Sequence, residues 1–206
     1  MRIAVLGATG GTGRLLVAQA LARGHQVDAI VRDPARAAFP ARPDLTIHQG
    51  DAHDEASIAA AIAPGAVVVS GLGLASKKDA GTLTAGARAV VAARPARIVW
   101  LGAIGTGRSA GVVGRLTALL LRAGLGPEYG DKVTADNAVL DAGGTVLHSG
   151  PLSGQADSPG TRAVPLAAAR RRFFPRSTPR ATIARLMLDA AEAPGHPGGL
   201  IVVAAR

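Results

Sequence analysis

Short apolar runs alternate along the chain with segments of helical periodicity. The apolar runs predict strands at residues 2–7, 25–32, 45–51, 65–73, 96–103 and 144–150. The periodic segments predict helices at residues 13–23, 55–63, 82–93 and 131–143, and a helix at 182–193 and a strand at 200–205 close the chain. Continuous apolar strands are typical of a sheet that is covered on both faces. The alternation therefore predicts an α/β fold with a doubly wound parallel sheet.

The pattern lapses between residues 151 and 180, where proline, glycine, serine and arginine dominate. Because no linker divides the rest of the chain and 206 residues fit one domain, we expect a single Rossmann-like domain over residues 1–206. The segment of about residues 151–180 is expected to bind substrate or to form a lid over the site.

The turn between the first predicted strand and helix is rich in glycine. Gly7, Gly10 and Gly13 are spaced three apart, and Gly11 is a fourth. Gly7 allows a sharp turn off the strand, Gly10 leaves room for a pyrophosphate beside backbone N–H groups, and Gly13 lets the helix pack close to the sheet. The helix N-terminus then offers free donors and partial positive charge. With a strand before and a helix after, this pattern favours a dinucleotide-binding loop over an ordinary turn.

The end of the second predicted strand, "IVRDP", bears on the type of nucleotide. Arg32 stands where NAD-preferring enzymes place an acid for the ribose 2′-hydroxyl. Arginine forms forked, charge-assisted hydrogen bonds to phosphate, and Arg14 could reach the same 2′-phosphate. We therefore expect NADP as the cofactor. The alternative is that Arg32 is a surface charge and Asp33 binds the ribose.

The motifs "GATGGTGR", "VRDPAR" and "GDAHD" resemble the atypical short-chain dehydrogenase/reductase family, above all its NAD(P)H-binding flavin reductase/biliverdin-IXβ reductase branch. The resemblance covers residues 1 to about 155, including "SGLG" and "SGPLSG", and "RATIA" at 180–184 resembles a motif near the family's last helix. It implies a Rossmann fold and an NAD(P)H-dependent oxidoreductase.

The resemblance also implies a cofactor-binding set. The pyrophosphate would be lined by Gly7, Thr9, Gly10, Gly11, Thr12 and Gly13, with Arg14 beside them. Arg32 would take the 2′-phosphate, and Asp51 would approach the adenine edge. Leu72 and Gly73 would contact the cofactor beyond the fourth strand. Residues 148–152, with Pro151 and Leu152, would lie along the nicotinamide.

The catalytic pair of most short-chain reductases is missing. In a Tyr-x-x-x-Lys pair the lysine lies one helical turn from the tyrosine and lowers its pKa. Here Val133 stands four residues after Tyr129, and Lys132 only three. We expect "GPEYGDK" to be a loop ending at Asp131 as helix N-cap, so that Tyr129 precedes the helix.

The usual serine partner is missing as well, since Gly102 and Ala103 stand at its place. Hydride transfer needs little more than a nicotinamide held near an acceptor. A flavin or quinone can take its proton from water, whereas a simple ketone benefits from a positioned acid. The sequence thus favours an NADPH-dependent reductase of a planar conjugated or carbonyl-bearing small molecule. The alternatives are an NADP(H)-binding redox sensor without catalysis and a tailoring isomerase or dehydratase.

Three further groups could take part in the chemistry. His148 ends the sixth strand and is the candidate proton donor, and the alternative is a strand-end histidine bonded to a backbone carbonyl. Arg170 to Arg172 could clamp an anionic substrate while Phe173 and Phe174 wall a planar ring. The alternative there is solvated charge beside buried phenylalanine. No cluster of His, Asp and Glu has metal-ligand spacing, so we expect no metal.

Composition limits the partners. The net charge of +9 could indicate nucleic acid, but the arginines are mostly scattered and only 2% of residues are aromatic, which argues against it. There is no cysteine, no run of 18 apolar residues, and the first glycine arrives at position 7, too early for a signal peptide. We expect a cytoplasmic protein with a small-molecule substrate and no membrane partner.

Overall fold

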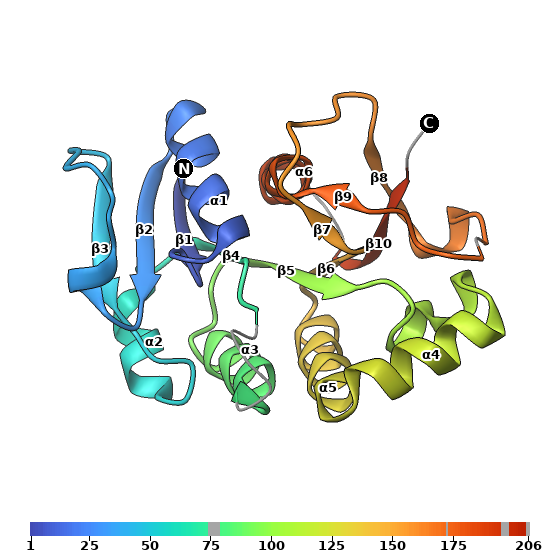
Figure 1. Ribbon diagram of the computed structural model, residues 1–206. Helices are drawn as coiled ribbons and strands as arrows, with labels where there is room; N and C mark the ends of the chain where they lie inside the picture. Colours follow the sequence, from blue (N-terminus) through green and yellow to red (C-terminus); the bar gives the residue numbers. More distant parts are fainter. Residues whose placement is uncertain (74–78, 172, 195–197, 205–206) are drawn as a thin grey trace.

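Strands and helices alternate along the chain in the computed structural model, which describes residues 1–73, 79–171, 173–194 and 198–204 (Figure 1). The strands are β1 (Arg2–Leu6), β2 (Gln26–Val31), β3 (Leu45–Gln49), β4 (Val67–Ser70), β5 (Arg97–Ala103), β6 (Thr145–Ser149), β7 (Leu152–Ser153), β8 (Arg162–Pro165), β9 (Thr178–Pro179) and β10 (Gly199–Ala204). The α-helices are α1 (Gly11–Ala22), α2 (Glu55–Ala61), α3 (Thr82–Ala92), α4 (Arg115–Leu125), α5 (Pro127–Asp141) and α6 (Arg180–Glu192). Short 3-10 helices are η1 (Pro34–Arg36), η3 (Gly107–Val112) and η4 (Leu166–Ala168).

An eight-stranded sheet forms the centre, in the order β3-β2-β1-β4-β5-β6-β10-β8. Neighbouring strands are parallel except β8, which runs antiparallel to β10. β7 and β9 pair separately. The strand order reverses between β1 and β4, and such a reversal opens a crevice beyond the carboxyl ends of the strands. The predicted fold class, a doubly wound Rossmann-like sheet, is confirmed.

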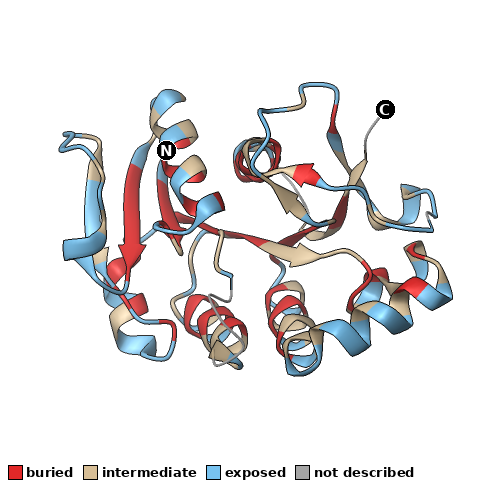
Figure 2. Cartoon of the chain, in the orientation of Figure 1, coloured by how far each residue is buried: buried red, intermediate tan, exposed pale blue. Residues whose placement is uncertain are grey.

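Two apolar layers hold the helices on opposite faces of the sheet. Because strand side chains alternate, Ile3 and Val5 of β1 pack with α1 and α6, whereas Ala4 and Leu6 pack with α2, α3 and α5. Trp100 of β5 is the largest fully buried side chain. Figure 2 shows the central strands as buried and the outer helix surfaces as exposed.

Three elements differ from the predicted pattern. β3 was expected to be covered on both faces, but as an edge strand it leaves residues such as Thr46 and Ile47 exposed. α4 was not expected at all, because its leucines do not mark a buried face. The segment of residues 151–180 contains β7, β8 and β9, so part of it joins the main sheet.

The start of α5 corrects the expectation that Tyr129 precedes the helix. α5 begins at Pro127, whose fixed φ suits the first helical position, and Glu128 follows in the first turn. Tyr129 therefore lies inside the helix. Asp131 does not cap its own helix. Its buried carboxylate instead accepts hydrogen bonds from the N–H groups of residues 81, 83 and 84, at 2.8–3.2 Å, and so caps α3.

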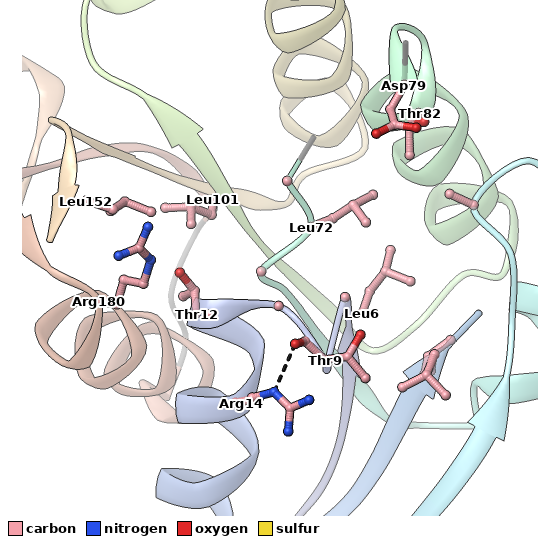
Figure 3. Close-up of a pocket in the computed structure, with 18 of the residues that line it drawn as sticks. Leu6, Thr9, Thr12, Arg14, Leu72, Asp79, Thr82, Leu101, Leu152 and Arg180 are labelled. Atoms are coloured by element: carbon pink, nitrogen blue, oxygen red, sulfur yellow. Dashed lines mark hydrogen bonds between the residues drawn. The ribbon is translucent and has the colours of Figure 1, made fainter. Parts of the chain in front are cut away.

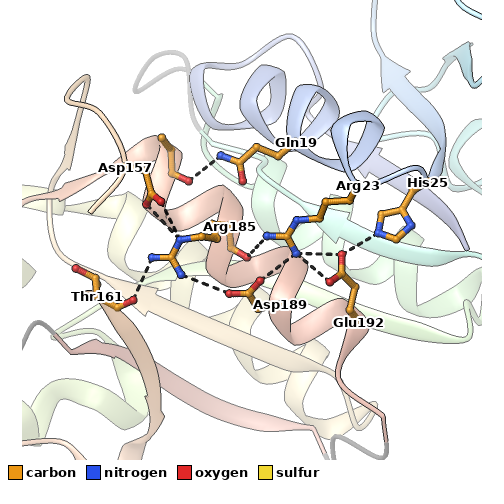
Figure 4. Close-up of polar contacts among 9 residues, drawn as sticks. Gln19, Arg23, His25, Asp157, Thr161, Arg185, Asp189 and Glu192 are labelled. Atoms are coloured by element: carbon orange, nitrogen blue, oxygen red, sulfur yellow. Dashed lines mark hydrogen bonds and ion pairs between the residues drawn. The ribbon is translucent and has the colours of Figure 1, made fainter. Parts of the chain in front are cut away.

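Polar contacts join α1 to α6 (Figure 4). Gln19 donates to the carbonyl of Ala181 at 2.9 Å. The Arg23 guanidinium lies 3.0 Å from the Glu192 carboxylate and 2.9 Å from that of Asp189, and His25 Nε2 lies 2.8 Å from Glu192 Oε1. Burial raises the pKa of Glu192, but its hydrogen bonds with His25 and Arg23 outweigh burial, so the net pKa is lowered.

We expect Glu192→Gln to lower the free energy of unfolding at pH 7 by about 1 kcal/mol, because a partly exposed ion-pair network is lost. The folded-state pKa is depressed, so this stabilisation is present above the pKa of an unfolded glutamate, about 4.3, and is lost as the pH falls further. Denaturant unfolding at pH 7 and pH 3 measures both effects. Arg42→Ala, which removes an exposed pair with Asp44, is the matched control and should change nothing measurable. An equal loss for Glu192→Gln at both pH values would contradict the electrostatic account.

Candidate functional site

A cleft of about 770 Å³ lies beyond the carboxyl ends of the strands, where the strand order reverses (Figure 3). Its walls come from β1, β2, β5 and β6, from the turn that follows β4, from the start of α1 and from the first residue of α6. This is the position at which doubly wound sheets bind their ligands.

The glycine-rich turn forms one wall of the cleft. Gly7 has φ +73°, a conformation that side-chain-bearing residues rarely adopt. A Cβ on Gly13 would lie 2.1 Å from the Gly7 carbonyl oxygen, so this position admits no side chain. Gly10, the N-cap of α1, has extended backbone and is exposed. Because Gly10 has no side chain to cap the helix, the first N–H groups of α1 are left for a ligand.

Three arginines gather at the end of the cleft beyond β2, namely Arg14, Arg32 and Arg36. Arg14 Nε donates to the carbonyl of Thr9 at 3.0 Å, which holds that guanidinium beside the glycine turn. Asp33 also lines the cleft, but its carboxylate accepts from the N–H of Ala35 at 3.0 Å and caps η1. This end of the cleft is suited to an anion.

The opposite end is formed by the ends of β5 and β6. Gly102, Ala103, Ser149 and Gly150 line it. Two basic residues, Lys132 of α5 and Arg180 of α6, lie there too. The Arg180 side chain packs against the glycine turn, since a Cβ on Gly11 would lie 3.1 Å from its Nε. Figure 3 shows Arg180 between Thr12 and Leu152.

Most of the predicted cofactor-binding residues come together in this cleft. Those that line it are Gly7, Thr9, Gly10, Gly11, Thr12, Arg14, Arg32, Leu72, Gly73 and Leu152. Gly13 is buried behind the turn, and Pro151 lines a second cavity. Asp51 does not line the cleft, although Gly50 and Ala52 on either side of it do. Its carboxylate accepts from the N–H of His53 at 2.9 Å.

Sequence reasoning missed Arg36, Lys132 and Arg180. Arg180 stood in the "RATIA" motif, and its place at the start of the last helix was the available signal. Lys132 was considered only as a partner of Tyr129. With the helix placed from Pro127, Lys132 falls on its second turn and lines the cleft.

His148 does not face the cleft. Its side chain is 1% exposed, with Nε2 2.9 Å from Asp136 Oδ2 and Nδ1 2.7 Å from Ser109 Oγ. Side chains alternate between the two faces of β6, and His148 lies beneath Gly102 of the neighbouring strand β5. A Cβ added to Gly102 would lie 2.5 Å from the imidazole ring. Both ring nitrogens are bonded to side chains, not to a backbone carbonyl. His148 thus offers no free nitrogen to a bound cofactor, and the expectation that it donates a proton directly is not supported.

Tyr129 does not reach the cleft either. Its hydroxyl accepts from the N–H of Gly107 at 3.3 Å, and the guanidinium of Arg122 lies 5.9 Å from the centre of its ring. The residues of the cleft that the structure describes include no tyrosine or histidine. Among the described residues, the side-chain proton donors at the β5–β6 end are Lys132, Arg180 and the Ser149 hydroxyl.

A second cavity of about 330 Å³ lies on the other side of Pro151. It is bounded by Thr117, Leu120, Leu121, Gly124 and Leu125 of α4, and by Pro151, Phe174 and Pro175. Phe173 and Phe174 are exposed and in edge-to-face contact, which corrects the alternative of buried phenylalanines. Arg171 donates to the carbonyl of Gly111 at 2.9 Å, and Arg172 lies outside the described residues.

Neither a metal cluster nor a spanning helix occurs in the part of the chain that the structure describes. No three His, Asp or Glu side chains gather there to hold a metal ion. No helix in the same ranges has the length and apolar character needed to cross a membrane.

Comparisons with known proteins identify the family and the fold. A family model described as NAD(P)H-binding matches residues 7–194. A search of curated protein sequences found no match. An anaerobilin reductase from Escherichia coli is 22% identical, with a TM-score of 0.80, over 98% of this chain and 96% of that chain. A short-chain dehydrogenase/reductase from Veillonella parvula in complex with NADP is 17% identical, with a TM-score of 0.79, over 98% and 93%. An oxidoreductase from Lactococcus lactis is 16% identical, with a TM-score of 0.79, over 100% and 91%.

We expect Gly10→Val to weaken NADPH binding by about 100-fold or more, about 2.8 kcal/mol, and to leave the protein folded. An added Cβ meets only the Gly7 carbonyl, at 3.2 Å, and the longer valine side chain would enter the cleft where we expect the pyrophosphate. Gly13→Ala should instead destabilise the fold, because its Cβ would overlap the backbone. Fluorescence titration with NADPH and denaturant unfolding separate the two effects, with Gly130→Ala as control, since its Cβ meets nothing within 4 Å. Unchanged NADPH affinity in folded Gly10→Val would show that the loop is an ordinary turn.

Proposed function

This chain belongs to the NAD(P)H-binding family whose model spans residues 7–194, and we propose that it is an NADPH-dependent reductase of a planar conjugated small molecule. The observation that carries the proposal is the asymmetry of the cleft. One end gathers three arginines, and the other end presents glycine and alanine where a reductase of simple ketones needs a positioned acid.

The arginine end accounts for the choice of NADPH. Arg32 follows the β2 strand directly, and Arg14 and Arg36 lie beside it in the cleft wall. A 2′-phosphate is doubly charged and accepts forked hydrogen bonds from guanidinium groups. Asp33, the alternative ligand for the ribose of NADH, already caps η1. The contact geometry thus favours a phosphate over a ribose 2′-hydroxyl.

The pyrophosphate fits between the glycine turn and α6. The free N–H groups at the start of α1 face it from one side, and the helix dipole favours its negative charge. Arg180 approaches from the opposite side, with its side chain against Gly11. We propose that Arg180 neutralises the half of the pyrophosphate that carries the nicotinamide ribose.

The nicotinamide is assigned to the β5–β6 end. Gly102, Ala103, Ser149 and Gly150 provide a wall of small residues there, so the ring can lie close to the backbone. When bound, NADPH supplies the hydride. The protein contributes orientation, and Lys132 offers an ammonium group to a cofactor or acceptor oxygen. An acceptor that delocalises the added charge can take its proton from water.

The acceptor is assigned to the cavity beside Pro151. Its volume of about 330 Å³ lies within the range of small-molecule sites, and its walls are leucine, proline and phenylalanine. Gly150 and Leu152 line the cofactor cleft while Pro151 lines this cavity, so the two spaces adjoin. The segment of about residues 151–180 thus supplies one wall of the acceptor site. A flat apolar ring system fits such walls.

A redox sensor that binds NADP(H) without turnover is the second candidate. The absence of tyrosine from the described cleft residues favours it. It differs from the reductase in one measurable respect, since it consumes no NADPH with any acceptor.

We expect wild-type protein to bind NADPH more tightly than NADH by about 1–3 kcal/mol, because of charge-assisted bonds to the 2′-phosphate. Arg32→Ala should remove most of this preference and leave NADH affinity nearly unchanged. Titration of both cofactors by calorimetry measures the four affinities. Arg42→Ala, an exposed arginine away from the cleft, is the control. Equal affinities in the wild type, or a loss for NADH alone in Arg32→Ala, would contradict the assignment.

We expect flavins or quinones to be reduced faster than aliphatic ketones, because the described cleft residues include no tyrosine or histidine to protonate an alkoxide. Tyr129→Phe should keep most of the turnover, since the hydroxyl bonds to Gly107 rather than facing the cleft. Steady-state NADPH consumption over the three acceptor classes tests both points. A fall of about 100-fold in Tyr129→Phe, the scale of general acid catalysis, would restore tyrosine as the acid. Ketone rates above the others would overturn the acceptor class, and no turnover with tight NADPH binding would favour the sensor.

A further inference from the structure

Large exposed apolar side chains gather on one part of the surface. Seven such residues occur among the described ranges, and five of them belong to α4 and the segment that follows η4. The five are Leu116, Leu119, Leu120, Phe173 and Phe174, all more than half exposed. Soluble proteins rarely leave such side chains together in solvent unless something covers them.

The leucines form a stripe along α4. Leu116, Leu119 and Leu120 are spaced three and four apart, so they share one helix face, and exposed Ala123 extends it by another turn. The opposite face turns inward, where Thr117 is buried and donates to the carbonyl of Phe173 at 2.6 Å. In Figure 2 the outer surface of α4 is largely exposed.

The two phenylalanines adjoin this stripe. Phe173 lies against the start of α4, since a Cβ on Gly114 would be 3.2 Å from its ring. Phe174 and Leu120 border the same cavity. We call the leucines 116, 119 and 120 with phenylalanines 173 and 174 the apolar face.

The surroundings of the apolar face are basic. In the sequence, residues 104–127 contain three arginines and residues 166–178 contain four, with no aspartate or glutamate in either range. Arg115 and Arg122 flank the leucine stripe on α4, and Arg170, Arg171 and Arg176 are exposed around the phenylalanines. Within the described residues none of these five arginines forms an ion pair.

We propose that the apolar face docks on an anionic lipid bilayer. Leucine and phenylalanine side chains at the centre enter the boundary between headgroups and acyl chains, and the arginines around them contact the anionic headgroups. A second copy of this chain fits less well, because a symmetric contact would place one arginine-rich surface against another. The proposal replaces the expectation of no membrane partner, which rested on the lack of a spanning segment. It does not depend on the chemistry of the cleft.

Vesicle flotation tests the proposal directly, with phosphatidylcholine vesicles and with equal parts of phosphatidylcholine and phosphatidylglycerol. We expect about tenfold more protein on the anionic vesicles, and release by high salt, since each arginine near the surface adds to binding. The double variant Leu116→Ser with Leu119→Ser, neither of which lines the cavity, should lose most of this binding. Arg115→Gln with Arg122→Gln should weaken it as well.

The matched control is Ile47→Ser, which removes an exposed apolar side chain from β3, the edge strand at the other end of the sheet. It should float like the wild type, and thermal melts followed by circular dichroism should show all variants folded. Failure to float with anionic vesicles overturns the proposal, as does equal binding to both vesicle types. So does a dimer, seen by light scattering, that the leucine variant dissociates, since the face would then join two copies. None of these experiments measures the reduction of an acceptor. Their results therefore test the membrane proposal independently of the proposed function.

Discussion

The close contact between the first strand and the first helix is the constraint on which the site depends. Gly13 has no room for a side chain against the Gly7 carbonyl, and the left-handed backbone of Gly7 turns the chain toward the helix. Together they hold the N-terminus of α1 at the reversal of the strand order. The N–H groups at the start of α1, which a longer side chain would cover or displace, are thereby left open to the cleft. The proposed cofactor, NADPH, is inferred from the residues around this terminus, which are arginines on one side and small residues on the other.

The opposite side of α1 is fixed by α6. The contacts of Arg23 with Glu192 and Asp189, and of Gln19 with Ala181, keep the two helices side by side. α6 begins with Arg180, whose side chain rests against Gly11 of the glycine turn. These polar contacts between α1 and α6 lie on the outer surface. They thus help to position the Arg180 guanidinium inside the cleft. The buried pair of His148 with Asp136 lies beneath Gly102, where it joins β6 to α5 below the β5–β6 end of the cleft.

Local sequence patterns predicted the sheet and the glycine turn, because the residues that specify each feature are neighbours in the sequence. Alternating apolar runs and helices are typical of a covered parallel sheet, and three spaced glycines between a strand and a helix favour a close approach of the backbone. Sequence reasoning failed where contacts between elements distant in the sequence determine the role of a side chain. Asp131 resembles a cap for its own helix but caps α3, and His148 looks available at a strand end but pairs with Asp136 from another element. Arg180 reaches the glycine turn from a distant part of the chain, and its motif does not show which segment its side chain contacts.

Hydride transfer from the cleft to a neighbouring conjugated acceptor is the central claim, and a stereospecific isotope effect tests it most directly. Protein saturated with NADPH, deuterated at either the pro-R or the pro-S position of nicotinamide C4, is mixed with a quinone in a single turnover, and loss of the reduced-nicotinamide absorbance is followed. A nicotinamide held on one face of the β5–β6 end predicts a slower reaction with one diastereomer only. Oxidation at the same rate with both deuterated cofactors and with unlabelled NADPH, or no oxidation at all, would contradict the account.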